Sequence, residues 1–418
     1  MSANFTLFCP QCHYSFPPGK FVYVCPQCSH KYSTNTPPHG VLKTLYPYEE
    51  IKEKYKGAPL FTQLKKNQYL DILPIEKADS LGPLKVGQTP LYTFETEKEN
   101  GETVPFYLKD DSQNPTFSFK DRASQLVSAY AREHNIDTIV AASTGNAGSS
   151  LAGICASQKQ RAIIMVPKTA PAAKLLQIIM YGALPVLVEG NYDTAFDLSL
   201  EATQHFGWFN RNTGYNPFTI EGKKTVALEI FDQLKGKIPS RLFVPVGDGV
   251  IISGVYKGFE DLLKLGVITH MPVIVAVQSA RSDNLVRNIQ QDTFHMHPAT
   301  TLADSISVNY PRNFYMTRQF LQTYKGEAII VSDEEIIHAA SLLARETGIF
   351  AEPAAAAAMA GFLKHLQKGH YDKSHPALVL STGSGLKDIH TPLLNIQLPT
   401  PVKPNLEALK TLVEKAKQ

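Results

Sequence analysis

Short apolar runs alternate with stretches of helical periodicity over most of the chain beyond residue 120. The runs are rich in valine and isoleucine, and we expect strands at 91–94, 106–109, 138–142, 161–166, 185–188, 241–246, 272–277, 327–331 and 376–380. Helices are expected at 149–158, 172–181, 193–205, 220–234, 250–265, 333–347 and 353–367. This alternation predicts an α/β fold with a largely parallel sheet.

Three of the expected strands end in a glycine-containing turn that is followed by an expected helix, at Ser143–Gly148, Gly247–Ser253 and Ser381–Gly385. Ligands of open parallel sheets collect outside the carboxyl ends of the strands. Glycine lets backbone N–H groups approach an anion, and a following helix N-terminus favours its charge. Three such turns indicate a phosphorylated ligand. They match neither the G-x4-GK[ST] pattern nor G-x-G-x-x-G, which disfavours an ATPase or a nicotinamide-dependent dehydrogenase.

One lysine, Lys120, stands at the expected start of a helix, after the turn-rich run that includes Asn114 and Pro115. Ser118 and Asp121 have the spacing of a capping box. A cation in the first turn opposes the helix dipole, so Lys120 is either a surface accident or an amine whose pKa is lowered for covalent chemistry.

Four of the five cysteines fall within the first 28 residues, as two Cys-Pro-Gln-Cys pairs that begin at Cys9 and Cys25. Thiolates at this spacing can converge tetrahedrally on zinc, so Cys9, Cys12, Cys25 and Cys28 are the predicted ligands of a structural zinc site. Two redox-active pairs or a decayed site are the alternatives.

The composition is that of an ordinary soluble globular protein, with 43% hydrophobic and 19% charged residues. A net charge of +3 gives no reason to expect nucleic acid or a membrane surface as a partner. We find no signal peptide and no apolar run long enough to span a bilayer. A reducing cytoplasm is therefore expected.

A lysine, a phosphate cradle and no catalytic metal suggest pyridoxal phosphate bound as a Schiff base. The segment Pro115-Thr-Phe-Ser-Phe-Lys-Asp-Arg122 resembles the PTGSFKDR lysine motif of the threonine synthases, in the tryptophan-synthase-β-like (fold type II) family of pyridoxal phosphate enzymes. Further segments are similar to those of that family, namely Ser143–Asn146, Asn191–Asp193, Glu221–Thr225, Asp333–Ile336, Gly348–Ala354 and Thr382–Asp388. An N-terminal zinc-ribbon-like segment occurs on some threonine synthases.

The resemblance implies two open, mostly parallel αβα sheet domains with a small N-terminal zinc ribbon. It implies that Lys120 forms the Schiff base, that Asn146 bonds the phenolic oxygen of the cofactor, and that Phe119 packs on one face of its ring. Thr382 is expected to face the pyridine nitrogen, where a hydroxyl suits elimination and replacement over transamination. The cofactor phosphate is expected on the backbone N–H groups of Gly247, Asp248, Gly249, Val250 and Ile251.

The implied reaction is conversion of O-phosphohomoserine and water to threonine and phosphate. Ser143, Thr144 and Gly145 are expected to bind the α-carboxylate of this small amino-acid substrate. Lys120 is expected to move protons during removal of the Cα and Cβ protons, loss of the γ-phosphate and addition of water at Cβ.

Two places depart from the pattern of the threonine synthases. The glycine loop GNxGN reads Gly247-Asp-Gly-Val-Ile251 here and lacks both asparagines. In the segment NPxRxEG, Thr219 replaces an arginine that is suited to binding phosphate. Lys223, Lys224 and Arg122 are the cations that could supply the lost charge.

Two alternatives to a threonine synthase therefore stay open. One is a threonine/serine dehydratase-like ammonia-lyase or a β-replacing amino-acid synthase on the same scaffold. The other is a binding protein without turnover. We expect a zinc-ribbon-like segment at 1–36, a catalytic region at 37–395 with its smaller subdomain around 123–210, a peripheral helical segment at 396–418, and a homodimer.

Overall fold

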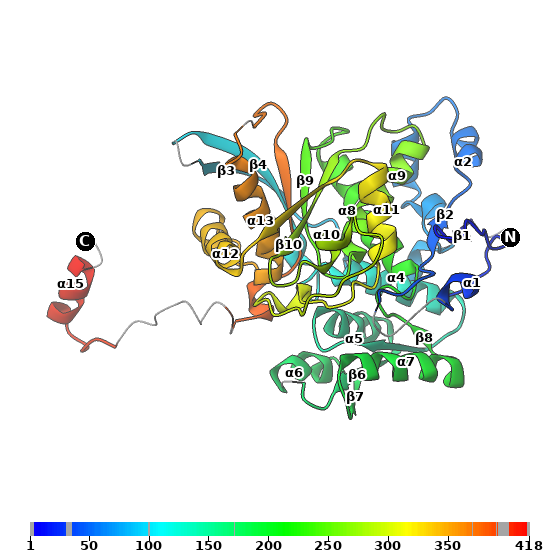
Figure 1. The fold of residues 1–418 in the computed structure, drawn as a ribbon, viewed down its shortest axis with the longest axis horizontal. Helices are drawn as coiled ribbons and strands as arrows, with labels where there is room; N and C mark the ends of the chain where they lie inside the picture. Colours follow the sequence, from blue (N-terminus) through cyan, green and yellow to red (C-terminus); the bar gives the residue numbers. More distant parts are fainter. Residues whose placement is uncertain are drawn as a thin grey trace.

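A computed structural model of the chain describes residues 4–30, 36–98, 101–170, 172–369, 371–389, 391 and 401–415, and Figure 1 shows its fold. Two separate sheets form the body, and helices cover both faces of each. The predicted arrangement of two mostly parallel αβα units is confirmed.

The larger sheet has six strands in the order β11-β10-β9-β12-β4-β3. All neighbours are parallel except β3 and β4, which form an antiparallel pair at one edge. The strands are β3 (Leu91–Glu97), β4 (Thr103–Asp110), β9 (Arg241–Pro245), β10 (Val273–Ser279), β11 (Glu327–Val331) and β12 (Ala377–Ser381).

Alternate residues of these strands enter two different cores, because side chains in a strand point to opposite faces. Leu242 and Val244 belong to the core that includes α8 (Phe218–Gln233), α9 (Val250–Lys264) and α11 (Phe314–Thr323). Phe243 belongs to the core of the other face, which includes α12 (Asp333–Thr347) and α13 (Pro353–Leu366).

The smaller sheet has four parallel strands in the order β7-β6-β5-β8. They are β5 (Thr138–Ala142), β6 (Arg161–Pro167), β7 (Leu184–Val188) and β8 (Phe209–Asn210). Helices α5 (Asn146–Gln158) and α6 (Ala172–Met180) pack on one face, and α7 (Tyr192–Phe206) packs on the other. Helix α4 (Lys120–Glu133) contacts both α5 and α8, so it joins the two units.

The N-terminal segment packs against the body at the right of Figure 1. Strand β1 (Thr6–Phe8) pairs with β2 (Lys43–Leu45) in a separate two-stranded sheet. The short helix α1 (Pro26–Ser29) begins directly after Cys25 and contains Cys28. The Phe21 ring lies 5.5 Å from that of Tyr130 and 5.0 Å from that of Phe218, measured between centroids. Two further helices, α2 (Tyr48–Lys54) and α3 (Leu60–Lys66), lead into the body.

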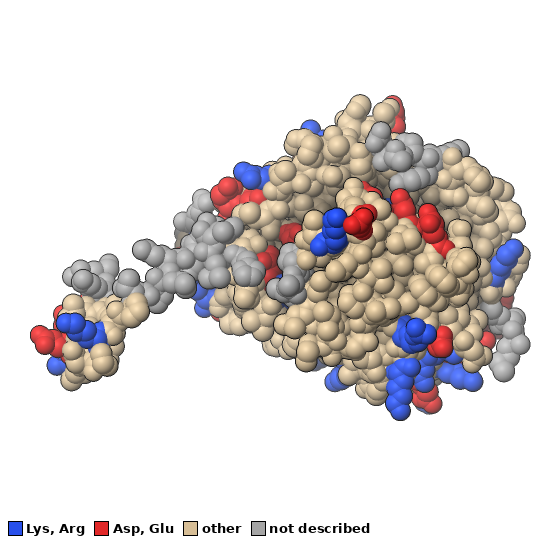
Figure 2. All heavy atoms as spheres, turned by 90° about the horizontal axis from the view of Figure 1, so that it is seen from below, with Lys and Arg blue, Asp and Glu red and all other residues tan. Residues whose placement is uncertain are grey.

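The last helix, α15 (Leu406–Lys415), stands apart from the rest of the molecule in Figure 1. The ends of the predicted C-terminal segment, 396–400 and 416–418, lie outside the described residues, as do 1–3 and 31–35 of the predicted zinc-ribbon-like segment. In the described part of the chain, no helix has the length and apolar character needed to cross a membrane. On the face drawn in Figure 2, basic and acidic side chains are interspersed.

Candidate active site

A cavity of about 530 Å³ opens at the carboxyl ends of strands from both sheets. Residues 141–147 reach it from the end of β5, residues 245–252 from the end of β9, and Thr382 from the end of β12. Lys120 enters from the first residue of α4. The three glycine-containing turns predicted from the sequence therefore meet at one cavity.

Lys120 lines the cavity and is half-buried. Burial lowers the pKa of its amine below the ordinary value, and the nearby Arg211 guanidinium lowers it further. The carboxylate of Glu352 opposes this shift. A lowered pKa makes the uncharged amine, the form that can attack a carbonyl or take up a proton, more accessible near neutral pH.

The predicted capping box before Lys120 is wrong. The N-cap of α4 is Phe119, whose side chain makes no cap, and the buried Ser118 hydroxyl has no hydrogen-bond partner among the described residues. Asp121 instead turns back and accepts hydrogen bonds from the backbone N–H and the hydroxyl of Thr116. This contact closes the turn that delivers the lysine to the cavity.

Asn146, the first residue of α5, bonds to a buried carboxylate in the cavity wall. Its Nδ2 donates to Glu352 Oε1 at 2.9 Å and to Oε2 at 3.0 Å, and it lies 3.4 Å from the hydroxyl of Ser305. Burial raises the pKa of Glu352, while Asn146 and Lys120 oppose that rise. Glu352 lies in the family-like segment Gly348–Ala354, but neither it nor Ser305 was given a role from the sequence, because each is distant from Asn146 along the chain.

The turn Gly247–Gly249 precedes α9 and has little room for side chains. Gly249 is the N-cap and has φ +83°, and a Cβ placed there would lie 2.3 Å from Thr317 Oγ1. A Cβ on Gly247 would lie 2.9 Å from the Cα of Ile306. The first N–H groups of a helix lack partners within it, so those that begin at Val250 suit an anion. Ile251 also lines the cavity.

The carboxylate of Asp248 lines the cavity yet is held by the loop that precedes α11. Its Oδ1 accepts from the backbone N–H of Arg312 at 3.1 Å, and its carbonyl oxygen accepts from the N–H of Asn313 at 2.9 Å. The hydrogen bond offsets part of the negative charge that the sequence introduces into this loop.

Thr382 lines the cavity at the end of β12, and its carbonyl oxygen accepts from the N–H of Phe119 at 2.8 Å. The Phe119 ring is fully buried 5.6 Å from the Arg122 guanidinium, and the residue is not among those lining the cavity. The stacking of Phe119 on a cofactor ring therefore stays a prediction.

The loop Ser143–Gly145 lines the cavity between β5 and α5. The N–H of Ser143 donates to Met165 O at 3.2 Å, and the N–H of Gly145 donates to the Ser143 hydroxyl at 3.3 Å. These contacts fix the loop beside Lys120. The binding of the substrate α-carboxylate by this loop stays a prediction.

Two cations in the cavity wall lie close to the start of α8, one before the helix and one within it. Arg211 and Lys223 both line the cavity and are buried. Arg122 and Lys224 are engaged elsewhere: Arg122 with Asp111 and Glu229, and Lys224 with Glu221 and Asp261. Of the three cations considered as replacements for an arginine at position 219, Lys223 is the one that reaches the cavity.

Thr219 itself is buried within the first turn of α8, where its hydroxyl donates to Asn216 O at 2.8 Å. Arg211 carried no motif and was missed from the sequence. Its contact with the carbonyl oxygen of Lys120, at 3.4 Å, joins residues 91 positions apart.

An ion pair spans the mouth of the cavity between Arg312, in the loop before α11, and Asp193, in the first turn of α7. The Arg312 guanidinium also lies over the ring of Phe196, 3.8 Å from its centroid. This contact connects the larger unit with the smaller one beside the cavity.

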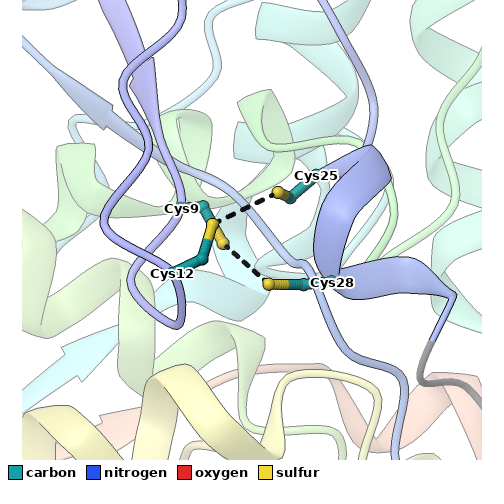
Figure 3. Close-up of side chains that lie close together, drawn as sticks. All are labelled: Cys9, Cys12, Cys25 and Cys28. Atoms are coloured by element: carbon teal, nitrogen blue, oxygen red, sulfur yellow. Dashed lines mark hydrogen bonds between the residues drawn. The ribbon is translucent and has the colours of Figure 1, made fainter.

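A second cluster forms at the N-terminus, where the side chains of Cys9, Cys12, Cys25 and Cys28 point toward one another (Figure 3). All four sulfur atoms lie within 4.8 Å of one another. Cys9 Sγ lies 3.7 Å from Cys28 Sγ, and Cys12 Sγ lies 3.6 Å from Cys25 Sγ, so each contact joins the two Cys-Pro-Gln-Cys pairs. Four sulfurs from two knuckles are the ligand set of a structural zinc site.

The cavity fits a phosphorylated aldehyde such as pyridoxal phosphate. Lys120 offers an amine of lowered pKa, and a glycine turn at a helix N-terminus offers backbone donors to a phosphate. The volume is within the range of cofactor sites. The buried Nζ of Lys223, which has no hydrogen-bond partner among the described residues, is consistent with an anionic ligand.

Comparisons with known proteins agree with this cavity. Residues 83–383 match the model of the pyridoxal-phosphate dependent enzyme family. The threonine synthase of Methanocaldococcus jannaschii is 34% identical over 381 residues, which cover 90% of this chain and 94% of that protein. The threonine synthase of Halalkalibacterium halodurans is 35% identical, over 81% of this chain and 94% of that protein. Maize serine racemase has the same fold, with a TM-score of 0.60 at 19% identity over 78% of this chain and 93% of that one.

Proposed function

Because this chain belongs to the threonine synthases of the pyridoxal-phosphate dependent enzyme family, we propose that it converts O-phosphohomoserine and water to threonine and phosphate. The chain is a pyridoxal-phosphate-dependent lyase. The observation that carries the proposal is Lys120, an amine of lowered pKa in a cavity that also contains the Gly247–Gly249 turn. The identity to threonine synthases over most of the chain supports this reaction over others on the same scaffold.

Bound pyridoxal phosphate supplies an aldehyde for the substrate amine and a conjugated ring that spreads the negative charge left at Cα after proton removal. Lys120, Asn146 and Thr382 are proposed to hold it, with the cofactor phosphate on the backbone from Gly247 to Ile251. The proposal is supported by the position of all these residues in the wall of one cavity.

Lys120 is proposed to carry the protons of the reaction. Its uncharged amine takes the proton from Cα and would deliver it to C4′ of the bound cofactor, which leaves the amine free to take a proton from Cβ. Removal of the Cβ proton allows the γ-phosphate to leave, and Lys120 then assists addition of water at Cβ. Burial keeps the pKa of this amine low, and Arg211 adds to that shift. The donors of Ser143, Thr144 and Gly145 are proposed to hold the α-carboxylate, so that an amino acid is oriented with its Cα toward Lys120.

The assay is incubation of the purified protein with O-phosphohomoserine, threonine or serine, with release of phosphate and of 2-oxo acid measured in parallel. We expect phosphate and threonine from O-phosphohomoserine. Release of 2-oxo acid from threonine, without phosphate from O-phosphohomoserine, would assign the chain to the ammonia-lyases instead. A Lys120→Ala variant should lose the visible absorbance of the bound cofactor, and persistence of that absorbance would contradict the role of Lys120.

Cys9, Cys12, Cys25 and Cys28 are proposed to hold one structural zinc ion. Four protein ligands leave no open position, so the role assigned is stability of the segment that packs against α4 and α8. Thiols kept reduced for metal binding also support a cytoplasmic location. A homodimer is proposed as well, and sedimentation of the purified protein tests it.

A further inference from the structure

Lys223 differs from every other lysine that is fully buried in the described part of the chain. Its Nζ is buried and has no hydrogen-bond partner, whereas the other three, Lys109, Lys224 and Lys257, each pair with a carboxylate. A buried ammonium group without a partner costs several kcal/mol by the usual order of magnitude. A lysine kept in such a position therefore indicates a binding site for an anion.

The position of Lys223 is set by close packing between α8 and α9. A Cβ on Gly254 of α9 would lie 2.5 Å from the Cβ of Lys223, so the glycine leaves room for the lysine stem. The Lys223 amine interacts electrostatically with Lys120, Arg211 and Asp248, all of which line the cavity. Burial lowers the pKa of Lys223 well below its ordinary value, and the two neighbouring cations lower it further.

Arg211 supplies a second positive charge in the same wall. Its guanidinium donates to the hydroxyls of Ser124 and Thr213 and to the carbonyl oxygen of Lys120, all of which are uncharged oxygens. Within the described residues it forms no ion pair with a carboxylate. Burial lowers the pKa of this guanidinium to about 10, which is the direction expected for a cation without a counter-charge.

Asp248 offsets part of the charge of Lys223, but three of the carboxylates that line the cavity are also engaged by other groups. Asp248 accepts from the backbone N–H of Arg312, Asp193 pairs with the Arg312 side chain, and Glu352 is held by Asn146. The N-terminus of α9 adds a further partial positive charge beside Asp248. The wall that contains Lys223 therefore suits an oxyanion of two negative charges.

We propose that Lys223 and Arg211 form a binding site for a phosphate monoester in this cavity. The inference rests on the proposed function, which brings two phosphate monoesters to the cavity, that of the cofactor and that of O-phosphohomoserine. Lys223 thereby supplies the positive charge that is absent at Thr219. Binding returns a proton to the lysine and pairs its charge, which makes the buried position favourable.

The test uses a Lys223→Met variant of the full-length holoenzyme, because methionine keeps the unbranched stem of the side chain and removes the amine. Three quantities are measured: the dissociation constant of pyridoxal phosphate from visible absorbance during dialysis, the KM for O-phosphohomoserine, and the inhibition constant of inorganic phosphate. A Lys237→Met variant serves as the control, since that lysine is exposed after the end of α8 and does not line the cavity.

For Lys223→Met we expect at least a tenfold change, either in the dissociation constant of the cofactor or in the KM and the phosphate inhibition constant. Weaker cofactor binding with an unchanged KM assigns the site to the cofactor phosphate, and a raised KM with weaker phosphate inhibition assigns it to the substrate. If the cofactor dissociation constant and the phosphate inhibition constant both stay within twofold of wild type, the proposal is overturned.

Failure of the proposed function has a different signature. If the wild-type protein releases no phosphate from O-phosphohomoserine, that reaction is excluded, and cofactor retention still tests Lys223. The phosphorus-31 resonance of the bound cofactor adds a readout that needs no turnover. If Lys223 binds the cofactor phosphate, this resonance should shift in Lys223→Met. An unshifted resonance would contradict the assignment of Lys223 to the cofactor phosphate.

Discussion

Two adjacent lysines of α8 are expected to respond in opposite ways to the same substitution. Lys224 Nζ lies 2.8 Å from Asp261 Oδ2 and also bonds Glu221, and all three side chains are fully buried. Lys223 is equally buried, but its Nζ has no partner among the described residues. Replacing each with methionine therefore removes a paired charge in one case and an unpaired charge in the other.

The structure gives the size of the two effects. Lys224→Met leaves Glu221 and Asp261 with Lys257 as their remaining buried cation, 3.8 Å from Glu221 and closer to Asp261. Breaking a buried pair by removal of one partner costs about 3–5 kcal/mol of unfolding free energy. Lys223→Met loses no hydrogen bond and exchanges a buried amine for an apolar group, so we expect a change within about 1 kcal/mol, or stabilisation.

The pH dependence of stability should separate the variants further. The pKa of Lys223 is well below its ordinary value in the folded protein, so the unfolded chain binds more protons between that lowered pKa and the ordinary value of about 10.4. The free energy of unfolding therefore rises with pH across that window and falls as the pH is lowered through it. Lys223→Met lacks this component of the pH dependence, while Lys224→Met retains it.

The assay is equilibrium unfolding in urea, followed by circular dichroism, on protein freed of cofactor and phosphate. These ligands must be absent because binding to the folded state would stabilise the wild-type protein and mask the cost of its unpaired lysine. Equal losses in the two variants would refute the reasoning. So would a loss of 3 kcal/mol or more in Lys223→Met.

Two other sites give sharp expectations. In a Cys9→Ser, Cys25→Ser variant, zinc measured by atomic absorption should fall to background, and an unchanged zinc content would contradict the proposed site. Placing alanine in the left-handed conformation costs roughly 1–2 kcal/mol by itself. Gly249→Ala should lower the unfolding free energy by more than this, because the added Cβ would lie 2.3 Å from Thr317 Oγ1. Gly266→Ala is the matched control, since Gly266 has φ +72° and no heavy atom within 4 Å of the added Cβ, and equal losses would be inconsistent with the clash.

The sequence was most informative where local pattern decides structure. Strand β5 was predicted at its observed bounds, because a run of apolar residues between polar ends is buried on both faces of a parallel sheet. Helix α12 was also predicted at its observed bounds, and its Ser332 side chain forms a capping box with Glu335. The glycine turns after β5, β9 and β12 were predicted correctly for the same local reason.

Predictions failed where a distant contact overrides the local signal. Ser118 and Asp121 have capping-box spacing, but Thr116 already uses the Asp121 carboxylate, so Ser118 is left without a partner among the described residues. Strand β8 has only two residues, too few for a period-two pattern, and it is ordered by pairing with β5. Pairing between β1 and β2, with Thr6 opposite Leu45, likewise has no local signature.

The charges of the site could be predicted only in part. Lys120 carried a motif, and Lys223 was one of three cations considered at the departure from the family pattern. Which of these lies in the cavity depends on the packing of α8 against α9, which sequence periodicity does not specify. Arg211 joins the site through contacts across the fold, and no local pattern indicates it. Glu352 lies in the family-like segment Gly348–Ala354, but its contact with Asn146 had no signal in the sequence.

The central claim is that phosphate leaves by cleavage of its bond to Cγ and that water then adds at Cβ. The most direct measurement is turnover of O-phosphohomoserine in oxygen-18 water, with mass spectrometry of the amino acid and phosphorus-31 NMR of the phosphate. The account predicts one oxygen-18 atom in the hydroxyl of threonine and none in the released phosphate. Oxygen-18 in the phosphate, with homoserine as the product, would show hydrolysis at phosphorus and contradict it.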